Sequence, residues 1–135
     1  MSEFAVFDTS VLIDHLRTNC HARRIADLDV TVRNASVVLA ELWRGTTEAV
    51  EQKVVREIAN AHPILTPTAS NWLESGQLLG RMHRDHGFKA KKLRDLHFDV
   101  LIALTARAYG ARLITSNRAD FELIRQYRNF KLEVW

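Results

Sequence analysis

The stretch FAVFDTS at residues 4–10 is the part of the sequence that decides the fold. Its first four residues form a short apolar run, which is typical of a buried strand. The polar residues after it are of the types that begin helices, and Val11, Leu12 and Leu16 continue at helical spacing. We therefore predict a strand that leads directly into a helix, with Asp8 at the carboxyl end of the strand.

Strands and helices alternate along the rest of the chain. Further strands are predicted at residues 30–32, 64–65, 112–115 and 131–134, and further helices at residues 22–28, 37–45, 48–60, 68–86, 98–109 and 119–125. Asn34, Ala35 and Ser36 are expected to form the start of the helix at residues 37–45. This alternation predicts an α/β domain with a mostly parallel sheet and helices on both faces.

Length and composition limit the possible classes of protein. A chain of 135 residues is expected to form one domain over residues 1–135. With 47% hydrophobic and 26% charged residues, it does not have the composition of a disordered segment. The single Cys20 excludes an intramolecular disulfide and a multi-cysteine zinc site. No apolar run is long enough for a membrane span, and Glu3 stands where a signal peptide carries basic residues, so we expect a cytoplasmic protein without membrane association.

Positive charge is concentrated in the second half of the chain. The net charge is +3 overall, but residues 1–67 hold 7 Lys+Arg and 9 Asp+Glu, whereas residues 68–135 hold 12 and 7. Much of the excess lies in one basic cluster of Arg81, Arg84, Lys89, Lys91, Lys92 and Arg94. Such a cluster can attract a polyanion, although a solvated helix face and loop is the simpler interpretation of the cluster alone.

Acidic residues are predicted at the ends of several elements. Asp8 follows the first strand, and Asp120 follows the strand at residues 112–115 after a short polar loop. Asp99 is expected to open the helix that precedes that strand, and Glu41 lies in a mostly apolar helical turn. Because functional groups gather beyond the carboxyl ends of parallel strands, these carboxylates can converge.

Each of these carboxylates also has a purely structural interpretation. Asp8 can cap its helix, Asp99 can favour a helix N-terminus, Glu41 can pair with Arg44, and Asp120 can begin the last short helix. If they do converge, their mutual repulsion is relieved most simply by a divalent cation. All-oxygen ligands suit Mg²⁺ or Mn²⁺, which points to phosphoryl chemistry.

Four segments taken together resemble a known family in their order and spacing. They are DTSVLID at residues 8–14, ELWRG at 41–45, DVLIALTA at 99–106 and TSNRADF at 115–121. The chain resembles, nearly from end to end, the PIN domain, and within that family the VapC-type toxins of bacterial type II toxin–antitoxin pairs. The residue before Asp99 is Phe98, where this family often has a polar residue, and Asn117 stands where many relatives have another Asp.

The resemblance implies an α/β/α sandwich and a Mg²⁺- or Mn²⁺-dependent endoribonuclease. By motif, Asp8, Glu41, Asp99 and Asp120 match the acidic residues that hold the metal and act in catalysis, and Ser10 and Asn117 match supporting polar positions. The expected partners are an RNA substrate, a cognate antitoxin and a second copy in a homodimer. We also expect phosphate contacts from Lys89, Lys91, Lys92 and Arg94, on charge alone.

Other functions stay open at this point. One alternative is a structure-specific nuclease, for DNA or for RNA processing, outside any toxin pair. Another is a non-catalytic PIN-like binding module whose acidic pocket captures an Arg or Lys of a partner. His83 and His86, three residues apart on a predicted helix, are interpreted as surface or core residues because no third metal ligand accompanies them at a recognised spacing.

Overall fold

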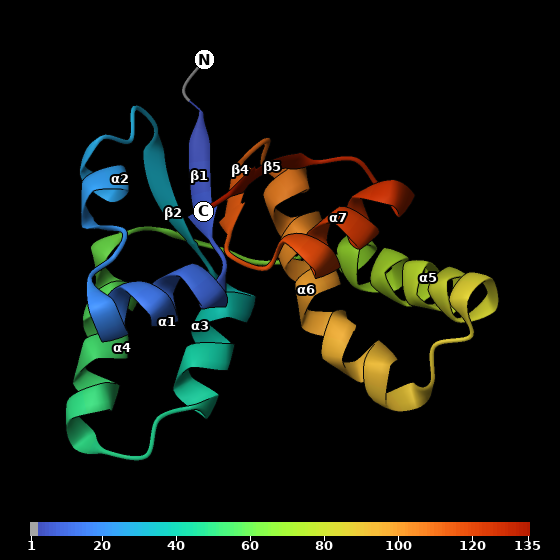
Figure 1. The fold of residues 1–135 in the computed structure, drawn as a ribbon, viewed down its shortest axis with the longest axis horizontal. Helices are drawn as coiled ribbons and strands as arrows, with labels where there is room; N and C mark the ends of the chain where they lie inside the picture. The colour runs from blue at the N-terminus through green and yellow to red at the C-terminus, as the bar shows by residue number, and fades with distance from the viewer. Residues whose placement is uncertain (1–2) are drawn as a thin grey trace.

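Strands and helices alternate along residues 3–135, the residues that the computed structural model describes (Figure 1). In chain order the elements are β1 (Phe4–Phe7), α1 (Thr9–Thr18), α2 (Ala22–Ala26), β2 (Thr31–Ala35), α3 (Ser36–Arg44), α4 (Ala49–Ala61), β3 (Ile64–Leu65), α5 (Ala69–His86), α6 (Ala90–Ala108), β4 (Arg112–Thr115), α7 (Arg118–Tyr127) and β5 (Lys131–Val134). As predicted, the first strand passes into its helix through Asp8 alone.

The sheet has the strand order β3-β2-β1-β4-β5, with β1 at its centre. Val6 of β1 is in register with Arg33 of β2 on one side and with Leu113 of β4 on the other. All four strand pairings are parallel, which confirms the predicted α/β class. The carboxyl ends of the strands therefore lie at one edge of the sheet, where Asp8 follows β1 and Ser116 follows β4.

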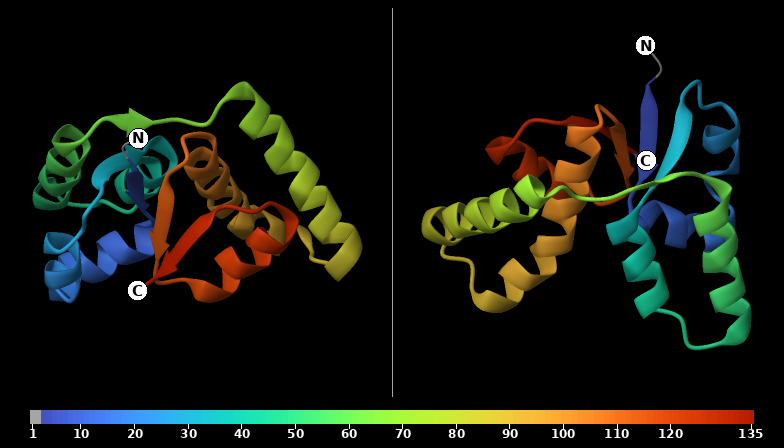
Figure 2. Two further views of the ribbon diagram at one scale, coloured as in Figure 1. Left: turned by 90° about the horizontal axis from the view of Figure 1, so that it is seen from above. Right: turned by 180° about the vertical axis from the view of Figure 1, so that it is seen from behind.

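Helices lie on both sides of the sheet (Figure 2). Val6 and Leu113 face the larger apolar layer, which includes buried residues of α3, α5, α6 and α7. Ala5 and Ile114 face the smaller layer, which is closed by α1, α2 and the C-terminal Trp135. Alternate residues of a strand point to opposite faces, so the two central strands supply both layers. The α/β/α sandwich implied by the resemblance is confirmed.

The start of α6 was predicted wrongly. We expected this helix to begin near Phe98 after a basic loop, with Asp99 opening it, but it begins at Ala90 and Asp99 lies near its middle. Residues 90–97 are mostly good helix formers, and Leu96 is fully buried in the core. The charged residues between the leucines obscured this apolar face. The interpretation of Asp99 as a favourable charge at a helix N-terminus is therefore excluded.

A smaller correction concerns β2. Asn34 and Ala35 were expected to cap a helix, but both belong to the strand, and α3 begins directly at Ser36. The Asn34 side chain instead donates hydrogen bonds to the carbonyl oxygens of Ile58 (2.9 Å) and His62 (3.2 Å) near the end of α4.

Within residues 3–135, no helix combines the length and apolar character of a membrane span.

Candidate active site

Asp8 is held at the carboxyl end of β1 by neighbouring hydroxyl groups. Its backbone N–H donates to the carbonyl oxygen of Ile114 (2.8 Å), which continues the pairing of β1 with β4. Its carboxylate Oδ2 accepts hydrogen bonds from Ser10 Oγ (2.7 Å) and Thr115 Oγ1 (2.9 Å). The residue is only 3% exposed. Although Asp8 occupies the N-cap position of α1, its side chain makes no capping hydrogen bond, so its carboxylate is oriented for another role.

The two hydroxyl groups that orient Asp8 are themselves fixed by the backbone after β4. Ser10 Oγ accepts from the N–H of Ser116 (3.1 Å), and Thr115 Oγ1 accepts from the N–H of Asn117 (2.9 Å). Ser10, predicted only as a supporting polar residue, thus orients a carboxylate of the site. The role of Thr115 was missed, although its place at the end of the strand beside β1 was the signal that could have revealed it.

Glu41 approaches from α3 and points toward the start of α1. Its Oε1 accepts a hydrogen bond from Thr9 Oγ1 (2.8 Å), and its Oε2 lies 3.8 Å from a guanidinium nitrogen of Arg44. Burial, followed by the nearby charge of Asp8, raises the pKa of Glu41 against the lowering effects of Thr9 and Arg44. Arg44 is mostly exposed and its contact is long, so the ion pair contributes little to stability.

Asp99 is the most perturbed acid of the site. Burial, the largest cause, raises the pKa of its carboxyl to about 8, and the negative charges of Asp8, Glu41 and Asp120 add to this shift while Lys92 opposes it. These charges act on Asp99 because four different segments bring their carboxylates to the same edge of the sheet. We call Asp8, Glu41, Asp99 and Asp120 the acid cluster; the other three act electrostatically on Asp99, and their common role as a metal site stays a prediction.

Asp120 lies in the first turn of α7 and is held by two side chains. Asn117, the N-cap of this helix, accepts a hydrogen bond from the Asp120 N–H (3.3 Å) and donates one from Nδ2 to Asp120 Oδ2 (3.1 Å). Lys92 Nζ donates to Asp120 Oδ1 (3.2 Å). Asn117 therefore both begins the helix and orients the acid, and both carboxylate oxygens of Asp120 already have partners.

The basic residues expected to contact phosphate are divided between two environments. Lys92 turns toward the acid cluster through its contact with Asp120. Lys91 instead pairs with Asp95 one helical turn further on (3.0 Å), and both side chains are mostly exposed. Lys89 and Arg94 are also exposed. Phosphate binding by the four residues stays a prediction, and Lys92 is the one that adjoins the acids.

A divalent cation fits the chemistry of the acid cluster but not a preformed cage. Within residues 3–135, no three or more His, Cys, Asp or Glu side chains are arranged to hold an ion together. Mg²⁺ commonly binds through one or two carboxylates and keeps several waters, so it does not require such a cage. Burial and then the negative charges of the other three acids raise the pKa of Asp99, and a bound cation would favour its ionised form.

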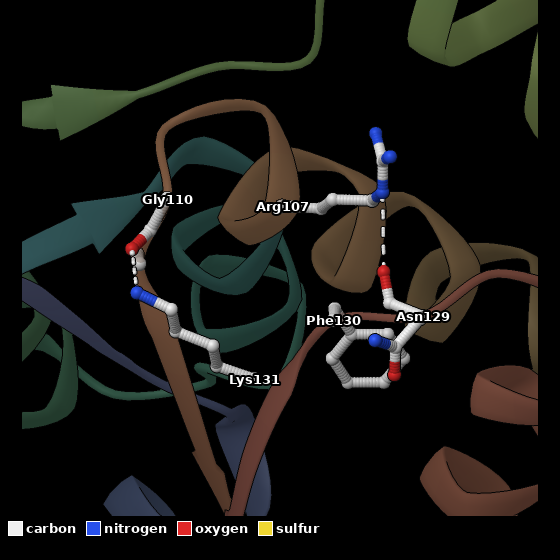
Figure 3. A pocket seen from close by; sticks show the side chains of 6 residues that line it. Arg107, Gly110, Asn129, Phe130 and Lys131 are labelled. Carbon is white, nitrogen blue, oxygen red and sulfur yellow. Dashed lines mark hydrogen bonds between the residues drawn. The ribbon is translucent and has the colours of Figure 1, made fainter.

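Two cavities of similar volume differ in their position relative to the acid cluster. One of about 320 Å³ lies at the opposite end of β4 and β5, beside Arg107 and Lys131 (Figure 3). It contains no acid, and its two cations already donate to the carbonyl oxygens of Asn129 and Gly110. The other, of about 310 Å³, is a largely apolar groove between α1, α3 and α4, with Glu41 in its wall.

The sequence was compared with known protein families and with curated proteins. The sequence model of the PIN domain matches residues 5–126. No curated protein sequence matches this chain significantly.

Several solved structures have the same fold. DNA-bound VapBC from Salmonella typhimurium includes a chain that is 23% identical, with a TM-score of 0.76, over 100% of this chain and 99% of that one. VapBC2 from Rickettsia felis, bound to a promoter DNA fragment, gives 21% identity and a TM-score of 0.74 over 98% of both chains. VapBC-5 from Mycobacterium tuberculosis gives 19% and 0.63, also over 98% of both.

Proposed function

This chain belongs to the PIN domain family, and we propose that it is a Mg²⁺- or Mn²⁺-dependent endoribonuclease that acts as the toxin of a type II toxin–antitoxin pair. The observation that supports this most is the position of Asp99, whose pKa is raised by burial and by three carboxylates from other segments. Groups with strongly perturbed pKa values gather at functional sites. Carboxylates at the carboxyl edge of a parallel sheet are suited to hard cations and phosphoryl transfer.

The four acids would have different duties. Asp8, which Ser10 and Thr115 hold in one orientation, and Asp99 are the main candidates to hold the ion. When bound, Mg²⁺ or Mn²⁺ lowers the pKa of a coordinated water and neutralises charge that develops on the phosphodiester. Glu41, with its raised pKa and its link to Thr9, is placed to receive the proton of the attacking water. Asp120, whose present partners are Lys92 and Asn117, would complete the set of acids.

The partner protein is proposed to be an antitoxin that covers the acid cluster. The three similar structures described above are all of VapBC proteins. The apolar groove between α1, α3 and α4 opens beside Glu41, so an apolar segment lying there could bring an Arg or Lys to the acids. Such a cation and Mn²⁺ should compete, and full-strength binding of both together would contradict this part of the proposal.

A matched pair of glutamate variants tests the proposed activity. Glu41→Gln keeps an acceptor for Thr9 but removes a charge, whereas Glu57→Gln makes the same change on the exposed surface of α4. Cleavage of a mixed RNA pool with Mg²⁺ should fall sharply in the first variant and be unchanged in the second. Equal cleavage by both would exclude Glu41 from catalysis.

Metal-linked stability separates a nuclease from a binding module. If a protein binds Mg²⁺ or Mn²⁺ only when folded, its melting temperature rises with ion concentration. We expect that rise in the wild-type protein and a smaller one in Asp99→Asn. A melting temperature that does not respond to either ion would favour the non-catalytic module.

A further inference from the structure

The turn between α5 and α6 stacks two aromatic rings. Gly87 has a φ of 68°, a left-handed conformation that ends α5 and reverses the chain between His86 and Phe88. The turn is fixed by the Gly87 N–H, which donates to the His83 carbonyl (2.9 Å), and by His83 Nδ1, which donates to the Phe88 carbonyl (2.6 Å). The rings of His86 and Phe88 lie 4.8 Å apart and within 11° of parallel.

A third ring joins them from α7, whose C-terminal end lies beside the end of α5 (Figure 2). Tyr127 meets His86 edge-on at 6.2 Å, and its hydroxyl donates to Asp85 Oδ2 (2.9 Å). We call His86, Phe88 and Tyr127 the aromatic cluster. Phe88 and Tyr127 pack against the core, whereas His86 is exposed. The core therefore holds two rings of the cluster in place, and the His86 ring contacts solvent.

Basic side chains surround the aromatic cluster and connect it to the acid cluster. The guanidinium of Arg81 lies 5.1 Å from the centroid of Tyr127, and Arg84 and Lys89 are exposed nearby in sequence. Lys92 provides the connection, because its ammonium is 3.2 Å from Asp120 Oδ1 and 5.9 Å from the centroid of Phe88. A nucleic-acid strand with a phosphodiester at the acid cluster would therefore pass the Lys92 ammonium before it reaches the aromatic cluster.

We propose that the aromatic cluster is a stacking site for a nucleobase of single-stranded RNA, next to the phosphodiester at the acid cluster; this rests on the proposed function. Single-stranded nucleic acids are bound by stacking their bases on aromatic side chains while cations follow the backbone. The cluster supplies the rings, with His86 as the contact surface, and Arg81 and Lys92 supply the cations. Every base has a flat face, so this site tolerates different sequences.

The test measures binding of a short labelled oligoadenylate by fluorescence anisotropy. A chelator keeps the RNA intact and leaves Lys92 paired with Asp120, as in this structure. His86→Ala should weaken binding about 5- to 150-fold, the range for loss of one stacked base. His86→Tyr, which keeps a ring, should bind like the wild type. His62→Ala removes another exposed histidine, at the end of α4, and should have no effect.

A second RNA, in which abasic residues replace the adenosines, separates stacking from charge. His86→Ala should make no difference to the binding of this RNA. Wild-type affinity of His86→Ala for oligoadenylate, or an equal loss on both RNAs, would overturn the stacking site. So would an unchanged RNA affinity combined with weaker binding of a partner protein.

Cleavage of a mixed RNA pool with Mn²⁺, measured in parallel, keeps the two proposals apart. A wild-type protein that cleaves, with a His86→Ala variant that binds normally, refutes the stacking site alone. A wild-type protein that does not cleave refutes the proposed function, even where binding depends on His86.

Discussion

Replacing Asp99 by Asn should make the metal-free protein more stable while removing its activity. The carboxyl of Asp99 has an ordinary pKa of 3.8 and a pKa of about 8 in the folded protein. Between these values the unfolded chain is ionised and the folded chain holds a proton, so folding takes up a proton. Stability therefore falls as pH rises from about 4 to about 8, by up to about 1.4 kcal/mol per pH unit, and levels off above that range.

The Asn variant lacks this titration. Its stability should equal that of the wild type near pH 4 and exceed it progressively toward pH 8, by at most on the order of 5 kcal/mol. Cleavage should meanwhile fall by about 100-fold or more, because one ligand charge is lost where charge develops in the reaction. Stability and activity would then change in opposite directions, as expected of a functional rather than a structural carboxylate.

Urea unfolding across pH with a chelator, combined with Mg²⁺-dependent cleavage of an RNA pool, measures both effects. Asp95→Asn is the matched control, since Asp95 is exposed on the same helix and pairs with Lys91. Wild-type and Asp99→Asn proteins with parallel pH dependence, and with undiminished cleavage by the variant, would refute the reasoning.

Three further predictions concern the residues that contact the other acids of the acid cluster. Thr115→Val removes a donor to Asp8 and an acceptor for the Asn117 N–H, so unfolding in urea should show a loss of about 1–3 kcal/mol, and a stability equal to wild type would contradict the hydrogen-bond network. Lys92→Met frees Asp120 and should tighten Mn²⁺ binding in a calorimetric titration, whereas weaker binding would show that the ammonium does not compete with the ion. The same variant should reduce the slope of log affinity for RNA against log salt concentration by about 1. An unchanged slope would show that Lys92 does not contact an RNA phosphate.

The sequence predicted the parts of the fold that depend on local pattern. Apolar runs bounded by polar residues located β1 and β4, and the alternation of strands with helices led to a parallel sheet. The beginning of α6 could not be located in this way. Its first two turns carry the exposed Lys91 and Arg94 and the half-buried Lys92. The apolar spacing of Leu93 and Leu96 is too short to be distinguished from a loop.

The candidate site was predicted as a set of acids but not as a network. The sequence positions and the family resemblance identified the acids Asp8, Glu41, Asp99 and Asp120. In the structure, the charges of the other three raise the pKa of Asp99. The partners that orient them depend on register. Thr115 reaches Asp8 only because β4 pairs with β1, and Lys92 reaches Asp120 only because α6 packs beside α7. The stacked rings of His86 and Phe88 likewise require the positive φ of Gly87.

The most direct test of the central claim is the metal dependence of RNA hydrolysis by the wild-type protein. A mixed pool of single-stranded RNA is incubated with the purified protein in Mg²⁺, in excess chelator, and in chelator followed by excess Mn²⁺. The acid cluster predicts cleavage in the first and third conditions and none in the second. Intact RNA in all three, or cleavage that persists in chelator, would contradict the account.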